Sequence, residues 1–165
     1  LVDEYWTGEH EVNGMIEIPA GKKLTLRDVT VSMSGYSEGD YVNSGLEVKG
    51  SLQTQGTVNL KNKNIFSKFK GITVLGNLSG ESISINGAWR GITLLPSGNV
   101  NLNQLTITNC TTGMHLLGGT MASISGTISN CEEYGVKEDG NGTYSYEGLA
   151  ITGCGRSRYK DGKAE

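Results

Sequence analysis

The chain has 165 residues, a formal net charge of −3 and 19% charged residues. It is long enough for one domain, and its charge does not fit a protein that binds nucleic acid or anionic membranes. No apolar run approaches the roughly 20 residues needed to span a bilayer, and no signal peptide is recognisable. Twenty-five glycines against two prolines favour a turn-rich all-β chain, because glycine costs about 1 kcal/mol per helix position relative to alanine.

The N-terminal segment, residues 1–13, contains Trp6 and His10 and is expected to close one end of the fold. The chain begins at Leu1 without a methionine, which indicates a processed protein or a fragment. The charge varies along the chain. Residues 1–60 hold nine acids and four bases, whereas residues 61–110 hold one acid and five bases, so the middle of the chain is locally basic.

A repeat follows this segment. Units beginning at Gly45, Gly71, Gly91, Gly113 and Gly135 align with spacings of 26, 20, 22 and 22 residues. Each unit opens with two residues in alternation, such as the apolar pair Ile92 and Leu94. Strict alternation predicts a strand with one buried face.

Each unit also closes in a similar way. The closing pattern occurs at residues 83–88, 105–110, 126–131 and 149–154, and more loosely at 24–29 and 58–63. Its next-to-last column contains only Asp, Asn and Gly, which accept positive φ most readily and therefore predict a bend. In the last four units its final column holds only Ala or Cys, as expected where the chain turns inward.

A unit of about 22 residues cannot bury its apolar face alone, but stacked units can. The sequence therefore predicts an all-β, right-handed parallel β-helix solenoid of about six coils of roughly 20–22 residues, with three parallel sheets. Residues 1–155 are expected to form this single domain. The alternative is a Greek-key sandwich or a jelly roll, which would not place the same residue class at the same offset in each unit.

The stacked G-I-x-L-x-G and I-T-N-C units resemble the pectate-lyase-like β-helix superfamily. Residues 6–8 and 18–26 also resemble the first coil of bacterial secreted β-helix proteins. The resemblance covers residues 5–155 approximately and implies the fold. It does not select a function, because the superfamily includes polysaccharide lyases, hydrolases, epimerases, tailspikes and non-catalytic adhesins.

Two insertions, residues 30–44 and 64–70, interrupt the repeat. Both connect a closing strand to the next opening strand, so they are expected to emerge at one corner of adjacent coils. With the equivalent corner of the next coil they predict an edge of aromatic and basic side chains: Tyr36, Tyr41, Phe66, Lys68, Phe69, Lys70, Trp89 and Arg90. Exposed aromatic side chains gather where a ligand stacks on them, and sugar rings are a natural partner. Alternatively, the inserted aromatic side chains fold back onto the flank of the solenoid.

The outward positions of the opening strands are expected to be Glu47, Thr73, Thr93, His115 and Lys137. This series contains no two neighbouring carboxylates, so the two-acid geometry of glycosidases and a calcium-dependent lyase site both lack their parts. His115 is the one candidate acid–base group. A lone exposed histidine is more often a solvated surface residue.

Cys110, Cys131 and Cys154 are expected to share one interior column. In-register strands hold neighbouring Cβ atoms about 4.8 Å apart, beyond the roughly 3.5–4.5 Å of a disulfide, so three free, buried and inert thiols are predicted. The column offers no His and no CxxC spacing, so neither a metal nor a cofactor is expected. Residues 156–165 are expected to form a polar, frayed C-terminal tail.

The preferred interpretation is a non-catalytic, secreted or cell-surface bacterial β-helix that binds a polysaccharide or another surface polymer, as adhesins do. Neither nucleic acid nor membrane insertion is expected. The alternative is a polysaccharide lyase or hydrolase, or a fragment of one, that acts at the outward sheet face around His115. A third hypothesis, a purely structural spacer, predicts no ligand.

Overall fold

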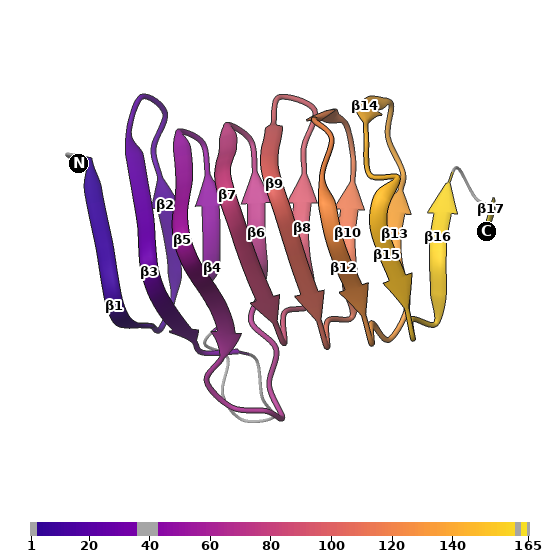
Figure 1. Cartoon of the computed structure of the whole chain (residues 1–165). Helices are drawn as coiled ribbons and strands as arrows, with labels where there is room; N and C mark the ends of the chain where they lie inside the picture. The colour runs from indigo at the N-terminus through magenta and orange to yellow at the C-terminus, as the bar shows by residue number, and fades with distance from the viewer. Residues whose placement is uncertain (1–2, 36–42, 161–162, 165) are drawn as a thin grey trace.

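The computed structural model describes residues 3–35, 43–160 and 163–164 and forms a parallel β-solenoid of about seven turns (Figure 1). It fits the right-handed parallel β-helix class that the repeat predicts. The described residues contain no helix, and therefore none that could cross a membrane.

Two sheets run the length of the molecule. The nine-stranded sheet contains β1 (Glu4–Val12), β3 (Lys23–Met33), β5 (Ser51–Asn62), β7 (Asn77–Asn86), β9 (Asn99–Thr108), β11 (Gly119–Met121), β12 (Ser125–Ser129), β14 (Gly142–Tyr144) and β15 (Gly148–Thr152). The eight-stranded sheet contains β2 (Met15–Ile18), β4 (Gly45–Val48), β6 (Gly71–Val74), β8 (Arg90–Leu94), β10 (Thr112–Leu116), β13 (Tyr134–Glu138), β16 (Arg156–Lys160) and β17 (Lys163–Ala164). All pairs are parallel except β16 with β17.

The prediction of three sheets is wrong for most of the molecule. In β3, β5, β7 and β9 the expected middle and closing strands run together as one strand of 10–12 residues. A bulge divides β3 between Arg27 and Val29, and a longer register break divides β5. Only the last two turns separate the two parts, into β11 with β12 and β14 with β15. A bulge bends a strand without ending its hydrogen-bond ladder, so period-two alternation does not reveal it.

The alignment of residues 24–29 with the closing pattern is also wrong, whereas Leu60 in residues 58–63 does pair with Ile85 as the alignment requires. Leu24 pairs with Leu52 and then Leu78, whereas Val31 pairs with Leu60, which pairs with Ile85. The closing column therefore begins at Val31, not at Leu26. Asp28 does have positive φ, but it lies at the bulge.

Near both ends of the described chain, segments that were expected to be a cap and a frayed tail form strands of the solenoid. Strand β1, within the segment expected to close one end, pairs with β3 as part of a full first turn. Residues 156–160, expected in a frayed tail, form β16 and pair with β13. These two additions account for seven turns instead of six.

A single hydrophobic core runs between the two sheets for the whole length of the solenoid. Its interior columns are occupied mainly by Leu, Ile and Val, as in the column of Leu46, Ile72, Ile92, Met114 and Val136. Stacking in register removes these side chains from water, which is the main stabilising contribution in a solenoid.

Candidate ligand-binding surface

The loop between β5 and β6, residues 63–70, projects beyond the turns that follow it (Figure 1). It emerges at the corner where the nine-stranded sheet ends and the eight-stranded sheet begins. The same corner of the next turn carries Trp89 and Arg90, at the start of β8. Tyr36 and Tyr41, also predicted at this edge, lie outside the described residues.

Phe69 was predicted on the exposed edge, and this is wrong. The side chain is fully buried, and its backbone forms an isolated bridge with Ala88. The insertion thus ends at Phe69, which takes the interior position that the alignment assigned to Lys63. Burying a phenylalanine side chain contributes about 1.5–3 kcal/mol, and the small Ala88 beside it leaves room for the ring.

Lys68 anchors the inserted loop to later turns. Its ammonium group donates hydrogen bonds to Thr111 Oγ1, at 3.0 Å, and to the Glu132 carboxylate. The side chain is 28% exposed, so the loop is tied to the corner of the solenoid. Lys70, two residues on, is exposed.

Two aromatic side chains of the predicted edge do face solvent. Phe66 is 87% exposed and Trp89 is 44% exposed. The Arg90 guanidinium lies 4.2 Å from the centre of the Trp89 ring, a cation–π distance. Trp89 is held at the corner by backbone hydrogen bonds to Phe69 below and Thr112 above.

Seven outward residues form a row across the eight-stranded sheet. In order of turns they are Glu17, Glu47, Thr73, Thr93, His115, Lys137 and Tyr159. The expectation that this face has no neighbouring carboxylates is wrong, because Glu17 and Glu47 are directly paired. Lys49 joins them, with its Nζ 3.1 Å from Glu17 and 3.5 Å from Glu47. Glu17 was missed because the repeat was recognised only from Gly45 onward.

His115 is buried, not solvated as expected. It is 6% exposed, and its Nε2 lies 2.7 Å from Asp139 Oδ2. Its Nδ1 is buried and has no hydrogen-bond partner among the residues that the structure describes. Burial lowers the pKa of His115, and the charges of Arg90 and Lys137 act in the same direction, against the opposing effect of Asp139. Arg90 and Thr93 belong to β8, and Thr93 pairs with His115, so the Trp89–Arg90 corner adjoins the row that contains His115.

Asp139 lies between the imidazole of His115 and the ammonium group of Lys137. Burial acts to raise its pKa, but the hydrogen bond with His115 and the charge of Lys137 outweigh that effect and hold the pKa below its usual value. Lys137 Nζ is 3.5 Å from the Asp139 carboxylate. The carboxylate is therefore ionised at neutral pH and fixes the position of both neighbours.

A cluster of rings and cations that sequence analysis missed extends the same face over the last two turns. Tyr134 and Tyr159 pack edge to face with ring centres 5.3 Å apart. Lys137 Nζ lies 5.4 Å and 5.6 Å from these two rings. Tyr159 belongs to the segment expected to be a frayed tail, and for that reason the cluster was not anticipated.

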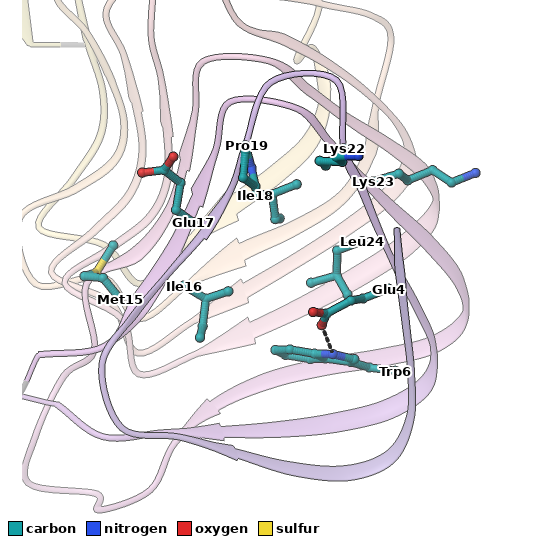
Figure 2. Close-up of a pocket in the computed structure, with 10 residues that line it drawn as sticks. All are labelled: Glu4, Trp6, Met15, Ile16, Glu17, Ile18, Pro19, Lys22, Lys23 and Leu24. Atoms are coloured by element: carbon teal, nitrogen blue, oxygen red, sulfur yellow. Dashed lines mark hydrogen bonds between the residues drawn. The ribbon is translucent and has the colours of Figure 1, made fainter. Parts of the chain in front are cut away.

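The open N-terminal end of the solenoid contains a cavity of about 240 Å³. Figure 2 shows Ile16, Ile18 and Leu24 pointing toward the same space beside the Trp6 ring. Trp6 Nε1 donates a hydrogen bond to Glu4 Oε2 at 3.0 Å, and the ring stacks on His10 at 4.8 Å. The cavity is mainly apolar, because side chains of the hydrophobic core line it.

Within residues 3–35 and 43–160, no three His, Cys, Asp or Glu side chains gather closely enough to hold a metal ion. Searches of known protein families, curated protein sequences and solved structures find no match to this chain. No match supports membership of the pectate-lyase-like superfamily, so that resemblance rests on the repeated sequence motifs alone.

Proposed function

We propose that this chain is a non-catalytic, secreted or cell-surface β-helix that binds a carbohydrate polymer on the outer face of its eight-stranded sheet. The observation that carries the proposal is Trp89, 44% exposed and flanked by the Arg90 guanidinium. An exposed indole offers a flat apolar surface to the C–H face of a sugar ring. A guanidinium donates hydrogen bonds to hydroxyl or carboxylate oxygens.

The face beyond Trp89 is long enough for several sugar units. From the turn of Trp89 to the turn of Tyr159 there are three steps of about 4.8 Å, or about 14 Å in total. The intervening row offers the Lys137 ammonium beside the tyrosine rings, whereas Thr93 is buried. Because these groups stand on rigid strands, a polymer would bind with little ordering of the protein.

The charge of this face from the turn of Trp89 onward, away from Glu17 and Glu47, suits an acidic or hydroxyl-rich polymer. Lys70, Arg90, Lys137 and Arg156 lie on or beside it. Asp139 is already engaged by His115 and Lys137, so it adds little negative potential for a ligand.

The state of His115 favours binding over catalysis. A general acid or base needs a ring nitrogen within hydrogen-bond reach of the substrate. Here Nε2 is bonded to Asp139, and Nδ1 is buried. We therefore assign His115 a positioning role for Asp139 and Lys137.

Glycan-array binding and pull-down on insoluble polysaccharides test the proposal. Trp89→Ala is expected to weaken binding about tenfold, which corresponds to about 1.4 kcal/mol. Lys137→Ala is expected to weaken the binding of acidic polymers more than that of neutral polymers. Tyr5→Ala is the matched control, because it removes a side chain that is 53% exposed from the other sheet. If the unaltered protein binds no polymer, or if all three variants bind equally, the proposal fails.

One observation favours a second candidate, a polysaccharide hydrolase. Glu17 and Glu47 are neighbours on the outward face, and paired carboxylates are the usual groups of glycosidases. A reducing-end assay on a polysaccharide panel separates the candidates. Activity that disappears in both Glu17→Gln and Glu47→Gln supports the hydrolase. If the unaltered protein releases no product, hydrolase activity on the panel tested is excluded.

A further inference from the structure

A groove of about 360 Å³ lies beside the inserted loop, residues 63–70, where strands of the nine-stranded sheet end. This volume is within the range of ligand-binding clefts, about 300–1,000 Å³. Four successive turns, from the third to the sixth, contribute its lining. We call it the amide groove, because its lining includes the asparagines Asn62, Asn86, Asn109 and Asn130.

The side chains of these asparagines offer both kinds of hydrogen-bonding group. An amide has two N–H donors and an oxygen acceptor. Asn109 Nδ2 donates a hydrogen bond to Asn86 Oδ1 at 3.1 Å, and Asn62 Nδ2 donates one to the Ser67 carbonyl oxygen at 2.9 Å. Each bond uses a single donor, so every amide keeps further hydrogen-bonding capacity. Asn86, Asn109 and Asn130 are exposed, so a ligand can reach them.

The bend column fixes the positions of these amides. Asn109 and Asn130 lie in adjacent turns of this column with φ of 54° and 55°, and adjacent turns are about 4.8 Å apart. Gly87 occupies the column in the fourth turn, and a Cβ atom there would lie 2.4 Å from Asn62 Cγ, so the glycine leaves room for the Asn62 amide. A ligand would therefore bind with little ordering of the protein.

The charged groups that line the amide groove neutralise each other. In the described structure its lining contains one cation, Lys68, and one anion, Glu132, and these two side chains form an ion pair. The Trp89 face, on the other side of the corner, instead carries the cations of Arg90 and Lys137. The amide groove therefore suits a neutral, hydroxyl-rich ligand better than an acidic one.

An apolar side chain completes the lining of the amide groove. Ile65 lines it and is 83% exposed, and the adjacent Phe66 is 87% exposed. Covering such side chains removes apolar surface from water, which is favourable at about 25 cal/mol per Å². A sugar ring offers hydroxyl groups to the amides and an apolar C–H face to these side chains.

We propose that the amide groove is a second carbohydrate subsite, which binds neutral sugar units while the Trp89 face binds acidic units. The proposal rests on the proposed function in taking a carbohydrate as the ligand. Only two residues of the same turn separate Asn86 from Trp89, so one polymer chain can contact both sides of the corner. The ligand class that uses both subsites is a polysaccharide with neutral and acidic units.

Isothermal titration calorimetry with defined oligosaccharides tests the proposal. The neutral probes are cellohexaose, maltohexaose and mannohexaose, and the acidic probe is hexagalacturonic acid. The double variant Asn109→Gly with Asn130→Gly removes two amides and keeps the left-handed bends, because glycine accepts positive φ. It is expected to weaken the binding of a neutral probe about tenfold, through the lost hydrogen bonds, and to leave the binding of the acidic probe unchanged.

Two further variants support this measurement. Asn101→Ala is the matched control, because Asn101 is exposed on β9 outside the lining of the amide groove, and it should bind like the unaltered protein. Ile65→Ser leaves the bend column intact and is also expected to weaken the binding of a neutral probe. It provides the test if circular dichroism shows that the double variant is unfolded.

Trp89→Ala distinguishes this proposal from the proposed function, because it is expected to weaken the binding of the acidic probe. If Trp89→Ala weakens binding but the groove variants do not, the amide groove is not a subsite and the Trp89 site stands. If only the groove variants weaken binding, the Trp89 site fails and the groove stands. Absence of binding of every neutral probe, or equal losses for neutral and acidic probes in the double variant, also overturns the proposal.

Discussion

Asn109 and Asn130 adopt left-handed backbone conformations with φ of 54° and 55°, and Gly87 and Gly153 in the same column have φ of 84° and 63°. The bend predicted from this column is confirmed at these four positions. The reason is local, because few residue types accept positive φ without steric cost. Gly71 shows the other local constraint, since its φ is 104° and a Cβ atom there would lie 1.6 Å from the carbonyl oxygen of Arg90.

The surroundings of His115, by contrast, depend on residues that are distant in the sequence. Alternation correctly places its side chain on the outward face, but Asp139 and Lys137 belong to the next turn. These neighbours bury it and fix its hydrogen bond. The burial of Phe69 is likewise decided by Ala88 in the adjacent turn.

The lowered pKa of His115 predicts a loss of stability in mild acid. As the pH falls through about 6.5, the usual histidine pKa, the unfolded chain binds a proton at this residue before the folded chain does, so the free energy of unfolding decreases. Each unit of difference between the two pKa values contributes about 1.4 kcal/mol. The pKa of Asp139 is lowered in the folded chain, so its contribution to the free energy of unfolding is lost only at lower pH, below the usual pKa of a carboxyl group.

Urea unfolding at a series of pH values measures this effect. His115→Gln should flatten the dependence between neutral and mildly acidic pH, whereas His10→Gln serves as the control for the other histidine of the chain. An equal slope in the unaltered protein and in His115→Gln would falsify the assignment.

At the level of the element, the three cysteines follow the closing strands at equivalent positions, as the repeat predicts. All three are free, and Cys110 and Cys131 are buried. The prediction is wrong for Cys154, which lies in the last described turn and is partly exposed. Burial raises the pKa of Cys110 to about 11, and burial together with the neighbouring thiols raises the pKa of Cys131 to about 12.

These values predict unequal thiol reactivity, because the thiolate is the reactive form. At mildly alkaline pH, a thiol reagent such as iodoacetamide is expected to label Cys154 alone in the folded protein and all three thiols after denaturation. Mass spectrometry of the labelled peptides measures this directly. Cys154→Ser should abolish labelling of the folded protein, and rapid labelling of Cys131 in that variant would contradict the buried column.

At the scale of the whole molecule, each turn is supported by the turns on both sides, except at the ends. Solenoid stability is approximately a sum of contributions from single turns and from the interfaces between neighbouring turns. Equivalent positions in different turns should therefore contribute unequally. Ile92 in the fourth turn is fully buried, whereas Ile16 in the first turn, from the same column, is only partly buried.

Ile92→Ala is expected to reduce the free energy of unfolding by about 2–5 kcal/mol, through lost burial and a residual cavity. Ile16→Ala should reduce it clearly less, because its side chain is only partly buried in the described structure. Denaturant unfolding of the two variants and the unaltered protein compares these losses. Equal losses would show that the first turn is as well covered as the fourth.

The sequence by itself determined the solenoid, the bends and the shared interior columns, because each depends on residue type at a fixed offset in a repeated unit. Only the tertiary structure decided the number of sheets, the register of the first turns, and which predicted surface residues are exposed. Alternation reports which side of a strand a residue faces, but burial and pairing depend on the turns above and below. The row from Glu17 to Tyr159 exists only once those turns are stacked.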